Sequence, residues 1–123
     1  MKKLEIRVER PGYSLNRFKE VFKELSEGRD VQSEEYIAVS TIEELNRLLS
    51  PKRLQMLNYL KRHQVRSISE LAKKLKRDYK NVYSDLKLFE ELGIVKLEKK
   101  NGSTVPYVVY DELDIKIPLY TTP

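Results

Sequence analysis

Residues 67–97, SISELAKKLKRDYKNVYSDLKLFEELGIVKL, decide the fold. Leu71, Ala72 and Leu75 recur at helical spacing and predict a helix that begins near Ser69. The pair Arg77-Asp78 predicts a tight turn into a second helix, Tyr79 to Leu92, which Gly93 should end. Two short helices joined in this way form a helix-turn-helix.

The pattern changes after Gly93 from helical spacing to strict alternation. Ile94, Val95 and Leu97 precede the polar stretch 99–102, and apolar residues return over 105–110. The stretch 99–102 ends in Asn-Gly, the pair that favours a two-residue hairpin turn. A β-hairpin, or wing, is therefore expected directly after the helix-turn-helix.

Two further helices are predicted before residue 67. Ser50-Pro51 places a capping serine before a proline at the first helical position, and this helix should run to about Arg62. Ser40 and Glu43 have the spacing of a capping box and should open a shorter helix. The expected buried residues of the two helices are Leu54, Leu57 and Leu60, and Ile42, Leu45, Leu48 and Leu49, respectively.

The two ends of the chain predict a small sheet. Alternating apolar residues over 4–8, 36–39 and 113–119 indicate strands, and an apolar stripe from Leu15 to Leu25 indicates a helix capped by Ser14 and ended by Gly28. The predicted fold is α+β: a winged helix-turn-helix at 41–123, with an N-terminal β-α-β extension at 1–40 whose sheet the C-terminal strand completes. The two strands of the β-α-β extension should be parallel. Residues 1–40 are expected to serve assembly or dimerisation.

Charge and composition limit the classes of function that the protein can have. The net charge is +5, but residues 52–100 carry fourteen Lys and Arg against six acidic residues, whereas residues 1–40 are neutral. A positive region suits a polyanionic partner. No cysteine is present, no apolar run approaches a membrane span, and the cytoplasm is the expected compartment. His63 is the single histidine, and no carboxylate pair or phosphate-binding loop accompanies it, so we expect no enzyme, metal or cofactor.

A helical wheel divides the Tyr79–Leu92 helix into a core face and a polar face. Val82, Leu86 and Phe89 share one side, and Asp85 lies toward it, which predicts a partner for Asp85 inside the protein. The residues expected to read bases in a major groove are Lys80, Asn81, Tyr83, Ser84 and Lys87. Tyr79 and Tyr83 could equally pack at helix junctions.

The remaining basic residues are assigned to the DNA backbone and the wing. Contacts to phosphates are expected from Lys73, Lys74, Lys76 and Arg77. Contacts from the wing are expected from Lys99, Lys100 and Asn101. Lysine-rich helix faces are often simply solvated, and the hairpin lysines could instead protect an exposed strand edge.

The combined motifs resemble winged-helix regulators, including the multiple-antibiotic-resistance and arsenic types. More closely, PKRL at 51–54, SISELA at 67–72, RDYKNVY at 77–83 and VPY at 105–107 resemble a family of predicted DNA-binding regulators of archaea and bacteria, over about residues 41–119. The resemblance implies a sequence-specific double-stranded DNA-binding transcriptional regulator, either a repressor or an antitoxin-like autoregulator. We further expect a homodimer, and a toxin is a conceivable partner. The alternatives are a module that binds a toxin or a transcription factor, and a binder of structured RNA.

Overall fold

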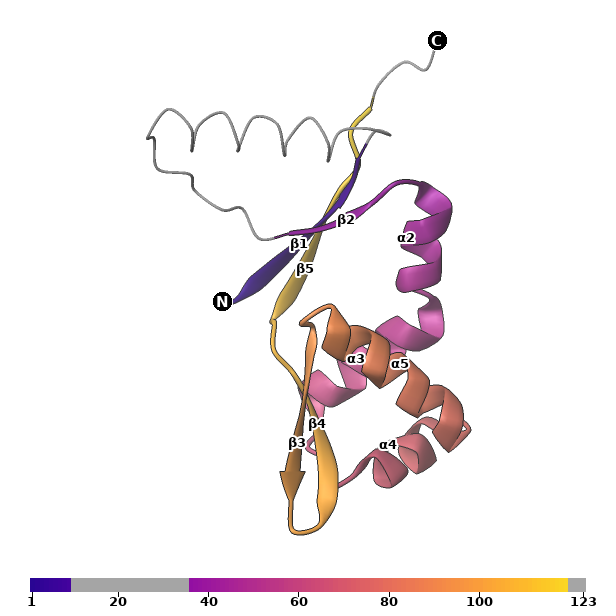
Figure 1. The fold of residues 1–123 in the computed structure, drawn as a ribbon, viewed down its shortest axis with the longest axis vertical. Helices are drawn as coiled ribbons and strands as arrows, with labels where there is room; N and C mark the ends of the chain where they lie inside the picture. The colour runs from indigo at the N-terminus through magenta and orange to yellow at the C-terminus, as the bar shows by residue number, and fades with distance from the viewer. Residues whose placement is uncertain (10–35, 120–123) are drawn as a thin grey trace. The chain divides into compact units, whose positions relative to one another are not determined.

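The computed structural model describes residues 1–9 and 36–119, and these form two compact units (Figure 1). The first unit comprises residues 1–3 and 48–112. The second comprises, among the described residues, 4–9, 36–47 and 113–119. This division differs from the predicted 1–40 and 41–123, because the C-terminal strand groups with the N-terminal segment. The helix predicted between Ser14 and Gly28 lies outside the described residues.

The first unit contains the helix-turn-helix and the wing. Its elements follow in the order α3 (Pro51–Arg62), α4 (Ile68–Leu75), α5 (Tyr79–Glu91), β3 (Val95–Lys100) and β4 (Ser103–Val108). Helices α4 and α5 pack on each other, α3 packs on β4, and α5 packs on β3. The side chains of Leu71, Val82, Leu86, Phe89 and Ile94 are fully buried between these elements. The predicted α+β winged helix is therefore the observed fold.

Serine caps and left-handed residues set the helix ends. Ser50 Oγ accepts a hydrogen bond from Arg53 N at 3.3 Å, as predicted for the start of α3. Ser67 Oγ accepts from Glu70 N at 3.0 Å, so α4 begins one residue before the predicted Ser69. Lys76 ends α4 in the left-handed region, with φ 54°, and Gly93 follows α5 with φ 76°.

The buried face of α3 differs from the predicted one. Met56 is fully buried and Leu57 nearly so, whereas Leu54 is 37% exposed. Helix α3 is therefore rotated toward Met56, and Leu54 is left on an outer face. The predicted buried residue Ile42 is similarly 41% exposed, while Leu45 and Leu48 of its helix are buried.

The wing is a two-stranded antiparallel hairpin with the predicted turn. Lys100 pairs with Ser103, which leaves Asn101 and Gly102 as the two turn residues. Their φ angles are 51° and 79°, the positive pair that a type I′ turn requires. Val105 turns inward and is buried, which anchors β4 on the unit.

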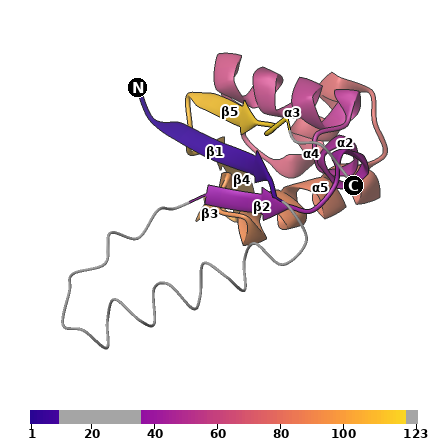
Figure 2. The same ribbon diagram turned by 90° about the horizontal axis from the view of Figure 1, so that it is seen from above.

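The second unit is built on a three-stranded sheet with the order β2-β1-β5 (Figure 2). Strand β1 (Lys3–Val8) pairs in parallel with β2 (Tyr36–Val39), and Leu4, Ile6 and Val8 are buried, as predicted. The neighbour of β1 on its other side is β5 (Glu112–Lys116), which ends before the predicted residue 119. The two ends of the described chain thus share one sheet.

The capping box of helix α2 (Ile42–Leu48) lies one residue later in the chain than predicted. Thr41 Oγ1 accepts from Glu44 N at 3.1 Å, and Glu44 Oε2 accepts from Ser40 N at 2.8 Å. The reciprocal pair is therefore Thr41 with Glu44, not Ser40 with Glu43. Among the described helices, none is long and apolar enough to cross a membrane.

Candidate nucleic-acid interface

The outward face of α5 presents all five residues that the sequence assigns to base reading. Val82, Leu86 and Phe89 are fully buried and fix the rotation of the helix. The side chains on the opposite and flanking positions are exposed; these are Lys80, Asn81, Tyr83, Ser84 and Lys87. Lys80, Asn81 and Ser84 lie in the first two turns, the end of a recognition helix that usually enters the groove.

Lys87 differs from Lys80 because it already has a counterion. Its ammonium donates to Glu90 Oε1 at 2.8 Å, and this hydrogen bond is the main cause that raises the pKa of Lys87. Lys80 takes part in no ion pair among the described residues. Of the two lysines, Lys80 therefore offers the more available positive charge to a polyanion.

Two tyrosines add a flat surface to the same helix. Tyr79 and Tyr83 are 47% and 43% exposed, and their rings stack with centroids 6.1 Å apart and an interplanar angle of 19°. The sequence left open whether they pack at helix junctions or point outward, and the structure places both outward. Tyr79 is a residue that the sequence did not include in the base-reading set.

Asp85 joins three parts of the first unit. Its Oδ1 accepts from Arg53 Nε of α3 at 3.0 Å, and its Oδ2 accepts from Arg77 Nη2, in the α4–α5 turn, at 2.8 Å. We call these three residues the Asp85 clamp. The Asp85 and Arg77 side chains are only 9% and 15% exposed. The prediction of an intraprotein partner for Asp85 is confirmed. Arg77, which the sequence assigns to a DNA phosphate, is one of the two arginines that bind this carboxylate.

The three lysines expected to contact phosphates lie on α4 and at its end. Lys73 is exposed and does not line the groove between α3 and α4. Lys74 and Lys76 do line this groove, together with Arg62.

The wing residues lie beside a second hollow. Lys100 and Asn101 line it with Arg66 and Gln64, from the segment between α3 and α4, and its volume is about 560 Å³. The Lys100 ammonium lies 5.1 Å from the centre of the Tyr107 ring, and the Tyr107 side chain is the main cause that raises the pKa of Lys100. Lys99 is exposed on the same hairpin.

Arg66 is a candidate DNA contact that the sequence did not indicate. It lies 34 residues from Lys100 in the chain, and no local spacing connects the two.

No group of three or more potential metal ligands occurs among residues 1–9 and 36–119. The ring of His63 packs against Tyr59 with centroids 4.5 Å apart.

The helix-turn-helix α4–α5 followed by the hairpin β3–β4 defines a winged helix. Residues 48–115, more than half of the chain, match the model of the HVO_A0114 family. The chain therefore belongs to the HVO_A0114 family. The matched segment coincides closely with the first unit.

Part of the chain is similar to a solved structure. It is the homodimeric winged helix-turn-helix DNA-binding domain (fragment 1-100) Mb0332 from Mycobacterium bovis, a possible ArsR-family transcriptional regulator. The likeness has a TM-score of 0.46 at 16% identity, over 55% of this chain and 62% of that domain. The matched region thus spans less than two thirds of the domain. No curated protein matches the chain.

Proposed function

We propose that this protein is a sequence-specific double-stranded DNA-binding transcriptional regulator in which α5 reads bases in the major groove. The observation that carries the proposal is the outward face of α5. It presents Lys80, Asn81 and Ser84, all exposed, on a helix whose rotation is fixed by three fully buried side chains. An asparagine amide can pair with adenine in two hydrogen bonds, and a lysine can donate to guanine.

The surroundings of α5 suit the DNA backbone. Lys73 on α4, and Arg66 and Lys100 beside the wing, are cationic side chains of the same unit. Phosphate contacts of this kind position a protein on the duplex and add affinity without reading sequence. We further propose a homodimer that addresses two half-sites, since one recognition helix covers only a few base pairs.

Selection of bound fragments from random duplex DNA should enrich one motif, and a palindromic motif is expected for the dimer. On the enriched site, Lys80→Ala and Asn81→Ala should each weaken binding by about 1–3 kcal/mol and relax the preference at one or two base pairs. Lys73→Ala is the matched control, because it should weaken binding to the enriched site and to random DNA about equally.

Three outcomes would contradict the proposal. Absence of an enriched motif would remove sequence-specific binding. Full discrimination in the variants at positions 80 and 81 would show that another surface reads the bases. Stronger binding to hairpin RNA than to duplex DNA would indicate that structured RNA is the ligand.

A further inference from the structure

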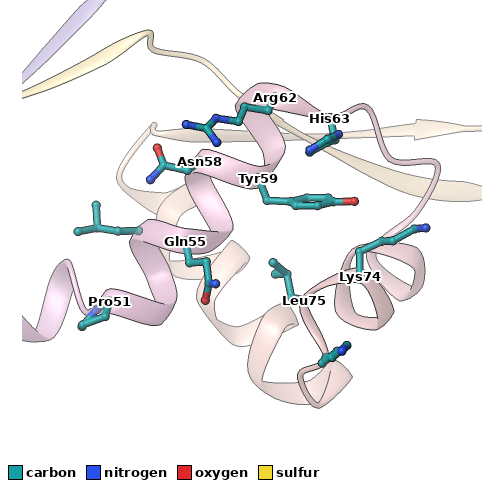
Figure 3. Close-up of a pocket in the computed structure, with 10 residues that line it drawn as sticks. Pro51, Gln55, Asn58, Tyr59, Arg62, His63, Lys74 and Leu75 are labelled. Atoms are coloured by element: carbon teal, nitrogen blue, oxygen red, sulfur yellow. The ribbon is translucent and has the colours of Figure 1, made fainter.

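A groove lies between α3 and α4 (Figure 3), and none of the proposed base-reading residues of α5 lines it. Its volume is about 590 Å³, within the range of small-molecule sites. One complete stripe of α3 forms one wall, and the end of α4 forms the other. We call it the α3–α4 groove; its lining residues are Pro51, Leu54, Gln55, Asn58, Tyr59, Arg62, His63, Lys74, Leu75 and Lys76. Lys80 and Ser84 of the reading face do not belong to it.

The α3–α4 groove carries positive charge without a counterion. Arg62, Lys74 and Lys76 line it, and no carboxylate belongs to its lining. None of these three forms an ion pair or a side-chain hydrogen bond with another described residue. Lys61 and Arg77, by contrast, neighbour them in sequence and are both held by aspartates. The net charge of the lining is +3 with His63 neutral.

The same groove offers a surface for a planar group. Figure 3 shows the Tyr59 ring extending from α3 into the space between His63 and Leu75. The Tyr59 and His63 rings are tilted by 31°, and the Leu54 side chain is 37% exposed at the edge of the lining. Gln55 and Asn58 add amide groups that can donate and accept hydrogen bonds.

We propose that the α3–α4 groove binds a nucleoside diphosphate. A diphosphate carries about the charge that three cations neutralise, and Arg62 can bind a phosphate through two parallel hydrogen bonds. The planar base would lie against the aromatic and aliphatic side chains, where Gln55 or Asn58 reaches its polar edge. The groove therefore offers cations for the phosphates and a flat surface for the base.

The bound ligand would act on the reading helix through the Asp85 clamp. Arg53 lies between Pro51 and Leu54, which line the groove, and Arg77 directly follows Lys76. A ligand that bridges α3 and α4 therefore contacts the neighbours of both arginines that hold Asp85 on α5. This effector role rests on the proposed DNA binding, whereas ligand binding itself does not.

Calorimetric titration of the full chain with ADP and with UDP, in the absence of DNA, tests the site. At least one nucleotide should bind, and adenosine and inorganic pyrophosphate should each bind at least about tenfold more weakly. Arg62→Ala and Lys74→Ala should weaken nucleotide binding about tenfold. The matched controls Lys52→Ala and Lys73→Ala, on the same helices but outside the groove, should leave it unchanged.

Several results would overturn the proposal. These are no binding of either nucleotide, equal binding of pyrophosphate alone, and equal losses in the Lys73→Ala control. For the effector role, saturating nucleotide should change DNA affinity in the wild type and not in Arg62→Ala, and an unchanged wild-type affinity would refute that role. A protein that binds nucleotide but no duplex DNA would refute the proposed function and leave the site standing.

Discussion

The loss of Asp85 should destabilise the first unit. Asp85 is 9% exposed and accepts from two guanidinium groups on different elements, so its removal takes one largely buried carboxylate away from two arginines at once. Breaking a buried ion pair by removing one partner typically costs about 3–5 kcal/mol, and the partial exposure of Arg53 favours the lower end.

We therefore expect Asp85→Asn to lower the free energy of unfolding by about 3 kcal/mol in urea denaturation. Glu91→Gln is the control, because Glu91 is exposed on the same helix and should change stability by less than about 0.5 kcal/mol. A loss below about 1 kcal/mol in Asp85→Asn would mean that the clamp adds little beyond solvated charges.

Only part of this arrangement could be predicted from single residues. The angular position of Asp85 near Leu86 and Phe89 indicated an internal partner, because a carboxylate on a core-facing side needs one. Its partners could not be named, since Arg53 is 32 residues away and belongs to another helix. Arg77 was assigned to DNA because a turn arginine in a basic run looks solvent-exposed until the fold brings Asp85 beside it.

The wing turn depends on backbone conformation alone. Gly102 has φ 79°, and a Cβ built at that position meets nothing within 4 Å. Gly102→Ala should therefore destabilise the hairpin through left-handed strain, without any clash, by about 1 kcal/mol in thermal unfolding. Lys99→Ala in the same hairpin should be nearly neutral. A neutral Gly102→Ala would show that the hairpin contributes nothing to the cooperative unit.

Element types were predictable where one local signal dominated. Ser50-Pro51 placed the start of α3, and Asn101-Gly102 placed the turn, because each sequence favours one backbone geometry. Boundaries shifted where two residues could serve equally: Ser67 caps α4 although Ser69 is as good a cap in sequence. The exposure of Leu54 was not predictable either, since the spacing of leucines on α3 could not show that Met56 takes the core position.

Pairing between segments that are far apart in the chain could be predicted only in part. Alternation at both ends indicated strands that need partners, and the sheet order β2-β1-β5 confirms that the ends share one sheet. The division into two units, with the last strand grouped with the first, depends on contacts over more than a hundred residues. The α3–α4 groove could not be predicted for the same reason. Its two walls belong to different helices, and the periodicity of one helix does not show which side faces the other.

The distribution of positive charge gives a direct test of the proposed function. Residues 52–100 hold an excess of eight positive charges, but Arg77 and Lys87 are already paired with Asp85 and Glu90. Outside the α3–α4 groove and the base-reading set, Lys73 and Lys99 are exposed on the first unit, with Arg66 and Lys100 beside the wing. About four phosphate contacts per protomer are therefore expected, each releasing condensed counterions on binding.

The logarithm of the DNA association constant should fall with the logarithm of salt concentration at a slope of about −4 per protomer, measured by fluorescence anisotropy on random duplex DNA. Lys73→Ala should make the slope shallower by about one unit, because it removes one phosphate contact. Lys87→Ala is the contrasting variant in the same unit and should change the slope much less, since Glu90 already neutralises its ammonium. A slope near zero would rule out an electrostatic DNA interface on this unit, and equal effects of the two variants would mean that the Lys87–Glu90 pair opens when DNA binds.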